Sequence, residues 1–409
     1  MQRILVVDAD PTVLSELEHK LANARSPWSV EHAASRDEAL ERLTHGPYDA
    51  VLSSPSIVGA DGSALLAEVK RREPSVLRLM LVSPAERDLA QKLAADAHQS
   101  LPKNASAESL RSALSRGIAL RDVLGNERLQ TLVAKLDHLP SVPSLYFELV
   151  EAMKAPDAKI ESLGRIIARD PGMTSKVLRT VNSAVFGLRE TITSPGQAAT
   201  FLGLDMLKSL VLSVGVFSQY DGQPTGEFSI EECWQHNLRV ASFTRAILQA
   251  ERAGKATIEE GVLAGMMHDA GQLVLATNRP ERFQAAHVFA ERDHAVRAEL
   301  ERRLFGASHA AVGGYLLDQW GLPTSVVEAV LFHHTPSTWL EDDFSPLCAV
   351  HVANALAGVD LEDADAELVE LDYGYLERLG LARRLSRWIQ ACRDAIEDER
   401  GATSESRST

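Results

Sequence analysis

The first hundred residues alternate short aliphatic runs with amphipathic stretches, and this alternation restricts the fold more than any other feature of the chain. The runs are typical of buried strands, and the stretches between them are typical of helices that cover a sheet. We predict strands at 4–7, around 30, at 50–53, 77–82 and 100–101, and helices at 11–24, 36–43, 62–72 and 85–95. Strands and helices that alternate at this spacing indicate a doubly wound, five-stranded parallel sheet, whose site lies at the carboxyl ends of the strands.

A long helical pattern covers residues 105–138 and overlaps the end of this first domain, which we place at 1–121. Its weak points are Gly117 and Gly125, because glycine disfavours a helix interior. A continuous helix of about 33 residues would span about 50 Å. Such a segment is either a simple linker or a lever that carries a change from one domain to the other, and we favour the linker.

The second half of the chain is predicted to be all-helical. No strand-like alternation is evident from Ser144 to about Ala357. Asp170 and Ser194 each stand before a proline, as N-caps do before a proline at the first helical position. We predict a helical domain at 139–340, a C-terminal helical extension at 341–400 with helices at 368–381 and 383–396, and a disordered tail at 401–409.

Composition narrows the class of protein. The formal net charge is −15, and the one short basic stretch, at 383–387, is more typical of a solvated helix face than of a DNA-binding surface. No apolar run approaches the roughly 20 residues that span a bilayer, and the N-terminus lacks the apolar stretch of a signal peptide. Three scattered cysteines, without a CxxC pair, argue against disulfides or a thiolate zinc site. We expect a soluble, cytoplasmic protein with no membrane partner.

Residues 1 to about 121 resemble the receiver domain of two-component response regulators, a bacterial family with a flavodoxin-like fold. Asp8 and Asp10 follow the first predicted strand, Ser83 follows the fourth and Lys103 follows the fifth. The resemblance implies that acids after the first strand help to bind magnesium, and that an Asp after the third strand accepts a phosphoryl group from a histidine kinase. Ser54 stands at that acceptor position in this chain.

The serine changes the expected chemistry. An aspartyl phosphate requires a carboxylate nucleophile and a divalent cation held by oxygen ligands, and a hydroxyl at position 54 removes one of each. We therefore expect little or no Mg²⁺ binding and no phosphoryl transfer from a kinase. The alternatives are a degenerate receiver domain used for dimerisation or docking, which we favour, and phosphorylation of Ser54 itself.

Residues from about 127 to 340 resemble the HDOD domain, a relative of the HD-type metal-dependent phosphohydrolases. Several motifs occur in the order that the family shows, and with the receiver domain the resemblance covers most of the chain. The motifs lie at 139–143, 167–173, 181–184, 201–203, 265–273, 320–323 and 333–334.

The histidines of this half form a candidate metal site. His268 and Asp269 are adjacent on a predicted helix, and His236 lies on an earlier helix with Glu232 one turn before it. His309 and the pair His333-His334 come later. Five imidazoles and two carboxylates suit Fe, Mn, Zn or Ni, and the resemblance to HD-type phosphodiesterases implies the same set. The alternative is that these histidines are structural. The predicted ligands are Glu232, His236, His268, Asp269, His309, His333 and His334.

Two departures from the HD-type enzymes argue against catalysis. The resemblance implies a further Asp late in the domain, and Asn354 stands at the best candidate position. It also implies a Lys three residues after the Asp of the pair, where Gln272 stands, and a downstream Gly-Tyr-Pro motif that is absent.

Three hypotheses follow. The first is a non-catalytic signalling module that binds a partner protein, such as a kinase, a cyclic-dinucleotide enzyme or another regulator, or a nucleotide, with a homodimer as an open option. The second is a metal-dependent phosphohydrolase that acts on a nucleotide or cyclic dinucleotide. The third, a DNA-binding regulator, is disfavoured by the acidic charge balance.

Overall fold

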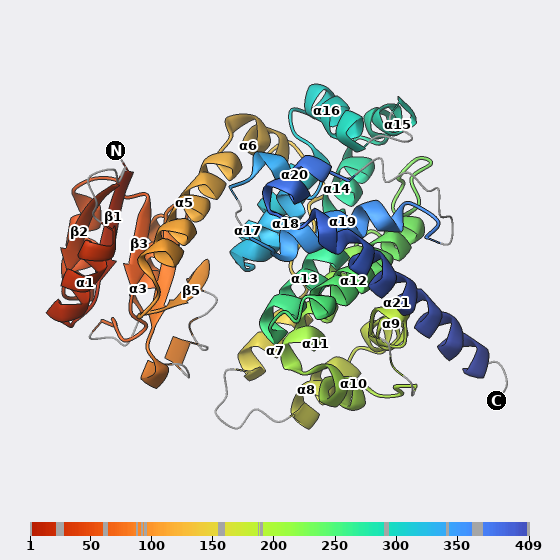
Figure 1. Ribbon diagram of the computed structural model, residues 1–409, viewed down its shortest axis with the longest axis horizontal. Helices are drawn as coiled ribbons and strands as arrows, with labels where there is room; N and C mark the ends of the chain where they lie inside the picture. Colours follow the sequence, from red (N-terminus) through yellow and green to blue (C-terminus); the bar gives the residue numbers. More distant parts are fainter. Residues whose placement is uncertain are drawn as a thin grey trace. The chain divides into compact units, whose positions relative to one another are not determined.

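The computed structural model forms two compact units (Figure 1). One contains Met1–Glu127 with Gly321–Thr324, and the other Arg128–Trp320 with Ser325–Thr409. Among the described residues, no helix is long and apolar enough to cross a bilayer. The structure describes residues 2–21, 28–59, 64–86, 89–90, 93, 96–153, 160–186, 188, 191–289, 294–340, 343–361 and 371–406.

The first unit contains a five-stranded parallel sheet with the strand order β2-β1-β3-β4-β5, which confirms the predicted fold. The order reverses between β1 and β3, and open sheets of this kind place their sites at such a reversal. Asp8 and Ser54 follow these two strands directly. The strands are β1 (Gln2–Val7), β2 (Trp28–Ala33), β3 (Ala50–Ser53), β4 (Leu77–Val82) and β5 (Gln99–Pro102).

Both faces of the sheet are covered, which explains the uninterrupted apolar runs in the sequence. Ile4 and Val6 of β1 pack into one core cluster with residues of α1 and α5, whereas Leu5 and Val7 pack on the opposite face with residues of α2 and α3. Each such buried aliphatic side chain contributes about 1.5–3 kcal/mol. The helical elements of this unit are α1 (Pro11–Leu21), α2 (Arg36–Thr44), α3 (Leu65–Arg72), the 3-10 helix η1 (Pro84–Glu86) and α5 (Ala107–Leu124).

The helix predictions for this unit are accurate to a few residues where they can be compared. α3 begins at Leu65 rather than at 62, and the helix predicted at 85–95 falls largely outside the described residues. The long helix predicted over 105–138 is interrupted. α5 ends at Leu124, with Gly125 as its C-cap, and α6 covers Glu127–Val133. Glycine has the lowest helix propensity after proline, which accounts for the break at Gly125.

The second unit is built from helices, as predicted. The proposed N-caps are confirmed, because the side chains of Asp170 and Ser194 accept the backbone N–H of Met173 and Gln197. α12 packs against α13, α19 and α21. The α-helices up to the midpoint of the unit are α7 (Ser144–Met153), α8 (Ile160–Ala168), α9 (Pro171–Val181), α10 (Pro195–Leu202), α11 (Leu204–Ser218), α12 (Ile230–Ala250), α13 (Lys255–Met267) and α14 (Ala270–Asn278).

The C-terminal segment completes this unit. The helix predicted at 368–381 is short, and that at 383–396 continues to Ser406, through most of the segment that we predicted to be disordered. Ala402 and Glu405 are good helix formers, and no proline interrupts them. Trp388 is fully buried, and its Nε1 donates to Glu251 at the end of α12. The remaining α-helices are α15 (Pro280–Phe289), α16 (His294–Phe305), α17 (His309–Gln319), α18 (Thr324–Phe332), α19 (Pro346–Ala357), α20 (Tyr373–Arg378) and α21 (Leu385–Ser406).

Candidate metal centre

The sequence predicted that His268 and Asp269 lie within one helix. In the structure they lie at the junction of two helices. α13 ends at Met267, and Asp269, with φ −101° and ψ 10°, is the N-cap of α14. On one continuous helix, adjacent side chains point about 100° apart. The junction allows both to face one centre, and His268 Nε2 lies 3.4 Å from Asp269 Oδ2.

Two glycines bring the neighbouring helices close to this junction. A Cβ atom at Gly271 would lie 1.9 Å from the carbonyl oxygen of His309, so only glycine allows the start of α17 to approach α14 this closely. A Cβ atom at Gly265 would lie 2.8 Å from the Cα atom of Ala241, which places α13 against the helix that carries His236. The glycines of the 265–273 motif therefore position the ligands.

Three further imidazoles surround Asp269. His309 is the first residue of α17, and its Nε2 lies 3.3 Å from Asp269 Oδ1 and 3.1 Å from His334 Nε2. His333 follows α18, with its Nε2 3.8 Å from Asp269 Oδ1. One ligand atom from each of Asp269, His309, His333 and His334 lies within 4.8 Å of the others, and we call these residues the four-ligand group.

A second group, which we call the three-ligand group, shares Asp269 and adds His236 and His268. The structure therefore brings together every predicted ligand except Glu232. That residue lies exposed in the first turn of α12, where its backbone N–H donates to the N-cap Ser229, and it belongs to neither group.

The imidazole rings are oriented by hydrogen bonds on the side away from the centre. His268 Nδ1 donates to the carbonyl oxygen of Gly265 at 2.8 Å, and His333 Nδ1 donates to that of Val330 at 2.7 Å. A carbonyl oxygen can only accept, so Nδ1 carries a proton in both rings, and Nε2 is the atom that faces Asp269. Metal-binding histidines are commonly held in this way.

Glu301 holds His309 and was not identified from the sequence. Its Oε2 accepts both the backbone N–H and Nδ1 of His309, each at 2.7 Å. Both side chains are fully buried. Glu301 lies on α16 and is joined to His309 through an interhelical loop, so no helical spacing links the two residues in the sequence.

The charges of the cluster are coupled. Burial alone would raise the pKa of Asp269, but contacts with His268 and His309 outweigh it and hold that pKa well below its usual range. Burial would lower the pKa of His309, but Glu301 and Asp269 raise it to about 9. Burial, together with the neighbouring His268, lowers the pKa of His333 well below its usual value. An ionised carboxylate and a neutral imidazole are the forms that bind metals, so Asp269 and His333 have the binding form at neutral pH, whereas His309 must lose a proton to bind.

The cluster fits a divalent transition metal. Among the described residues, His268 Nε2, Asp269 Oδ1 and His333 Nε2 are buried atoms with no hydrogen-bond partner. Leaving such atoms unpaired costs free energy, and all three belong to the two groups described above. Imidazole nitrogens with a carboxylate oxygen suit Zn, Fe, Mn or Ni.

Asn354, on α19, reaches the edge of the three-ligand group. Its Oδ1 lies 2.9 Å from His236 Nε2, and because an amide oxygen only accepts, His236 is the donor. Gln272 is buried on α14, one turn after the pair. His351 donates from Nδ1 to the carbonyl oxygen of His333 and accepts the N–H of Asp372 at Nε2.

The receiver-type residues also meet, at the carboxyl edge of the sheet. Lys103 Nζ lies 2.8 Å from Asp8 Oδ2. Ser54 is buried directly after β3, and Ser83 follows β4. Glu86, which the sequence analysis did not single out, lies between them and is bonded to both. Asp10 is exposed and accepts the backbone N–H of Thr12 at the start of α1.

Comparison with known families identifies both domains. The response regulator receiver domain matches residues 4–115, and the HDOD domain matches residues 139–336. The chain joins a receiver domain to an HDOD domain. The HDOD match contains both candidate ligand groups and ends before Asn354, and the receiver match contains the five predicted receiver-site residues and Glu86.

Solved structures share the HDOD fold. An HDOD domain protein of unknown function from Geobacter sulfurreducens is 23% identical, with a TM-score of 0.51, and the match covers 68% of this chain and 99% of that one. A protein from Shewanella amazonensis SB2B named as a candidate phosphohydrolase is 20% identical, with a TM-score of 0.50 over 66% and 99% of the two chains. At these identities the similarity shows the fold alone.

A curated relative, an uncharacterized protein of Treponema pallidum (strain Nichols), is 24% identical over 278 residues. The match covers 66% of this chain and 52% of the relative, so the chain spans about half of that protein's length.

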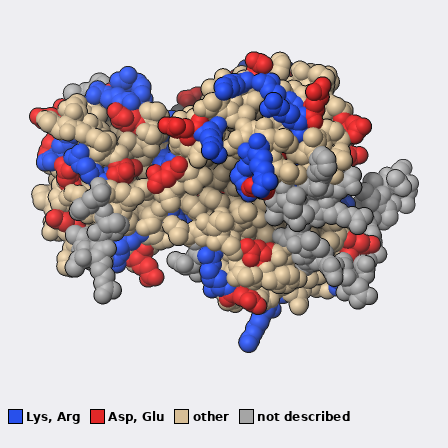
Figure 2. All heavy atoms as spheres, turned by 90° about the horizontal axis from the view of Figure 1, so that it is seen from above, with Lys and Arg blue, Asp and Glu red and all other residues tan. Residues whose placement is uncertain are grey.

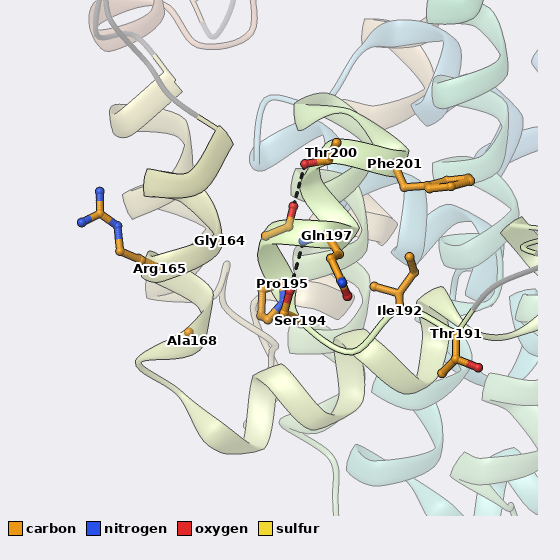
Figure 3. A pocket seen from close by; sticks show the side chains of 11 residues that line it. Gly164, Arg165, Ala168, Thr191, Ile192, Ser194, Pro195, Gln197, Thr200 and Phe201 are labelled. Carbon is orange, nitrogen blue, oxygen red and sulfur yellow. Dashed lines mark hydrogen bonds between the residues drawn. The ribbon is translucent and has the colours of Figure 1, made fainter.

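The HDOD domain also has a hollow of about 620 Å³ beside α8 and α10 (Figure 3). The two helices meet where Gly164 faces Gly196, and a Cβ atom at Gly164 would lie 2.7 Å from the Gly196 backbone. Ser194 and Thr200 in its wall bond within their own helix segment. None of the residues that line the hollow belongs to the His/Asp cluster.

Proposed function

We propose that this protein is a signalling module that acts by binding a partner protein, with a receiver domain that does not take up phosphate and an HDOD domain that does not hydrolyse nucleotides. The partner is another signalling protein, such as a kinase, a cyclic-dinucleotide enzyme or another regulator. Cys233, Cys348 and Cys392 are buried, and none of the three is in a disulfide, as suits a reducing compartment; we also propose a cytoplasmic location.

The receiver half of this proposal rests on Ser54. The residue occupies the position after β3 at which the family carries its phosphoacceptor, and its hydroxyl donates to Glu86 at 2.6 Å. A serine so engaged and 2% exposed offers neither a carboxylate nor an accessible hydroxyl. Lys103 already pairs with Asp8, so we propose that Mg²⁺ does not bind here either.

The single observation that carries the HDOD half is the hydrogen bond from His236 to Asn354. A neutral amide stands where the HD-type enzymes have a carboxylate, and it engages the Nε2 atom that would bind a metal. We propose that the three-ligand group is disabled in this way, and that Gln272 in place of a lysine further depletes the substrate-facing groups.

The four-ligand group supports one divalent transition metal, Zn, Fe, Mn or Ni. A metal there would supply Lewis acidity to a bound water or phosphoryl oxygen. Four protein ligands complete a tetrahedral site, and closed sites of this kind are structural in proteins, whereas catalytic sites keep an open position. We propose that Asp269, His309, His333 and His334 hold the ion as a structural element that fixes α14, α17 and the end of α18.

The second candidate is a metal-dependent phosphohydrolase, and the retained His/Asp cluster favours it. The two functions are separated by a hydrolysis screen of the metal-loaded full chain against mono-, di- and cyclic dinucleotides, with the His268→Ala/Asp269→Ala variant as the blank. We expect no turnover above the blank. Turnover that the double variant loses would establish the enzyme and overturn the binding module.

Figure 2 shows basic side chains interspersed with acidic ones over the face that it draws. A surface of mixed sign suits protein partners better than a phosphate backbone, whose binding depends on clustered Lys and Arg. The net charge of −15 also favours a protein partner over a nucleic acid.

A further inference from the structure

Glu86 links the ends of three strands in the receiver domain. It lies on η1, three residues after Ser83. Its Oε1 accepts the hydroxyl of Ser54, after β3, at 2.6 Å. Its Oε2 accepts the N–H and the hydroxyl of Ser83, after β4, at 3.1 and 2.6 Å, and lies 3.4 Å from the ammonium of Lys103, after β5.

The environment keeps this carboxylate ionised. Burial would raise the pKa of Glu86, but the hydroxyl donors Ser54 and Ser83 outweigh it and lower the pKa to about 2. The Glu86 side chain is 16% exposed, and the ammonium of Lys103 lies between this carboxylate and that of Asp8. The site therefore holds a fixed anion surrounded by donors.

These donors follow β3, β4 and β5, at the edge of the sheet where the receiver family carries its phosphoacceptor. In the family, a hydroxyl after the fourth strand and a Lys after the fifth stand beside the phosphoacceptor at the end of the third. Here Ser83 and Lys103 occupy those two positions, and the Glu86 carboxylate accepts a hydrogen bond from the hydroxyls of Ser54 and Ser83 and faces the ammonium. We propose that the Glu86 carboxylate is a resident anion, which replaces the phosphoryl group and links β3, β4 and β5 permanently, without phosphorylation.

A simpler alternative is a capping box. Ser83 and Glu86 have the spacing of that motif, and the N–H of Ser83 does donate to Glu86 as the motif requires. A capping box is a local device, however, whereas Glu86 also bonds to Ser54, 32 residues away, and lies near Lys103. The same unit contains a cap of the local kind at the start of α2, where the hydroxyl of Ser35 accepts the N–H of Glu38 and the carboxylate of Glu38 accepts the N–H of Ala34.

The two Ser/Glu pairs, Ser83 with Glu86 and Ser35 with Glu38, allow a test variant to be compared with a matched control. Hydrogen exchange is followed by mass spectrometry on the full chain, in peptides covering residues 53–57 and 100–104. The N–H of Ser54 donates to Val7 and that of Lys103 to Val82, so both amides report on fraying of strand ends. Glu86→Ala should accelerate exchange in both peptides by about tenfold, the equivalent of losing one charge-assisted hydrogen bond. Glu38→Ala should affect only the start of α2.

Chemical rescue makes the test specific for an anion. Glu86→Ala leaves two hydroxyls and an ammonium around an emptied position, so inorganic phosphate at millimolar concentration should restore slow exchange in the variant and change nothing in the wild type. If exchange in the two peptides is unchanged by Glu86→Ala, or if phosphate fails to restore it, the resident anion is refuted.

A milder variant covers the case in which Glu86→Ala unfolds the domain. Ser54→Ala removes the link from Glu86 to β3, together with the bonds between Ser54 and Ser56, and leaves the capping pair of Ser83 and Glu86 intact; Ser56→Ala is the control for those bonds. Ser54→Ala should accelerate exchange in the 53–57 peptide alone. Unchanged exchange there would show that Glu86 is merely a cap, and the proposal would fail. The test does not involve the HDOD domain, so its outcome is independent of the hydrolysis screen.

Discussion

Replacing Glu301 by glutamine should weaken metal binding without emptying any ligand position. Glu301 is fully buried and accepts two N–H groups of His309, each at 2.7 Å. A hydrogen bond to a charged acceptor contributes about 1.5–3 kcal/mol, against about 0.5–1.5 kcal/mol for a neutral one. Losing the charge at two bonds therefore costs about 2–3 kcal/mol, part of which appears in the stability of the apo fold.

The rest of this free energy should appear as a loss of metal affinity, because mutating a residue that holds a metal ligand typically lowers that affinity by 10–100-fold. The assay is competition for Zn²⁺ between the full chain and a chromophoric chelator. It is run at about pH 9, because the pKa of His309 is raised to about 9 and proton competition is weaker there. We expect Glu301→Gln to raise the Kd by about 10–100-fold.

Glu299→Gln is the matched control. Glu299 lies on the same helix, is 46% exposed and pairs with Arg302 and Arg303 at the surface. Its removal should leave the Kd unchanged. Equal affinities for wild type, Glu299→Gln and Glu301→Gln would refute the reasoning that Glu301 positions His309 for a metal.

Three further predictions concern stability. Gly271→Ala should destabilise the HDOD domain by about 3 kcal/mol or more, because a Cβ atom there would overlap the His309 carbonyl. Thermal unfolding should show a large drop in the melting temperature. Gly254→Ala should cause no such drop, because a Cβ atom at Gly254 meets nothing within 4 Å. Glu86 has a folded pKa of about 2 against 4.5 unfolded, so its contribution to stability is complete above about pH 4.5 and is lost as the pH falls toward 2; acid titration of amide exchange should show this loss in the wild type, and a loss of equal size in Glu86→Gln would contradict the account. Trp388→Phe should lower the free energy of unfolding by about 1–3 kcal/mol through the lost Nε1 bond, and unchanged denaturant unfolding would argue against it.

The parallel sheet could be predicted from sequence because burial on both faces leaves unbroken apolar runs, such as Ile4 to Val7, that few other folds require. Helix continuity was harder to predict. The expected connector is divided at Gly125, the C-cap of α5, and a glycine inside a helical pattern does not by itself end a helix. The helix beyond residue 401 was missed because the polar composition there is equally typical of a disordered tail.

Residue types pointed to the candidate metal ligands, but not to how they are brought together. His268 and Asp269 share a site only because α13 ends just before them and α14 begins just after them. No local helix propensity marks that break. Glu301 and Glu86 went unnoticed because their partners come from other elements. Glu232 was predicted one turn from His236, on the same face of the helix, yet it lies exposed outside the cluster.

The most direct test of the account is the metal content of the purified chain, measured by elemental analysis beside the His268→Ala/Asp269→Ala variant. The account predicts about one Zn, Fe, Mn or Ni ion per chain in the wild type, held by the four-ligand group, and none in the variant. Two ions per chain would show that Asn354 does not disable the three-ligand group. No metal under several loading conditions would show that the cluster is purely structural, and either result would contradict the account.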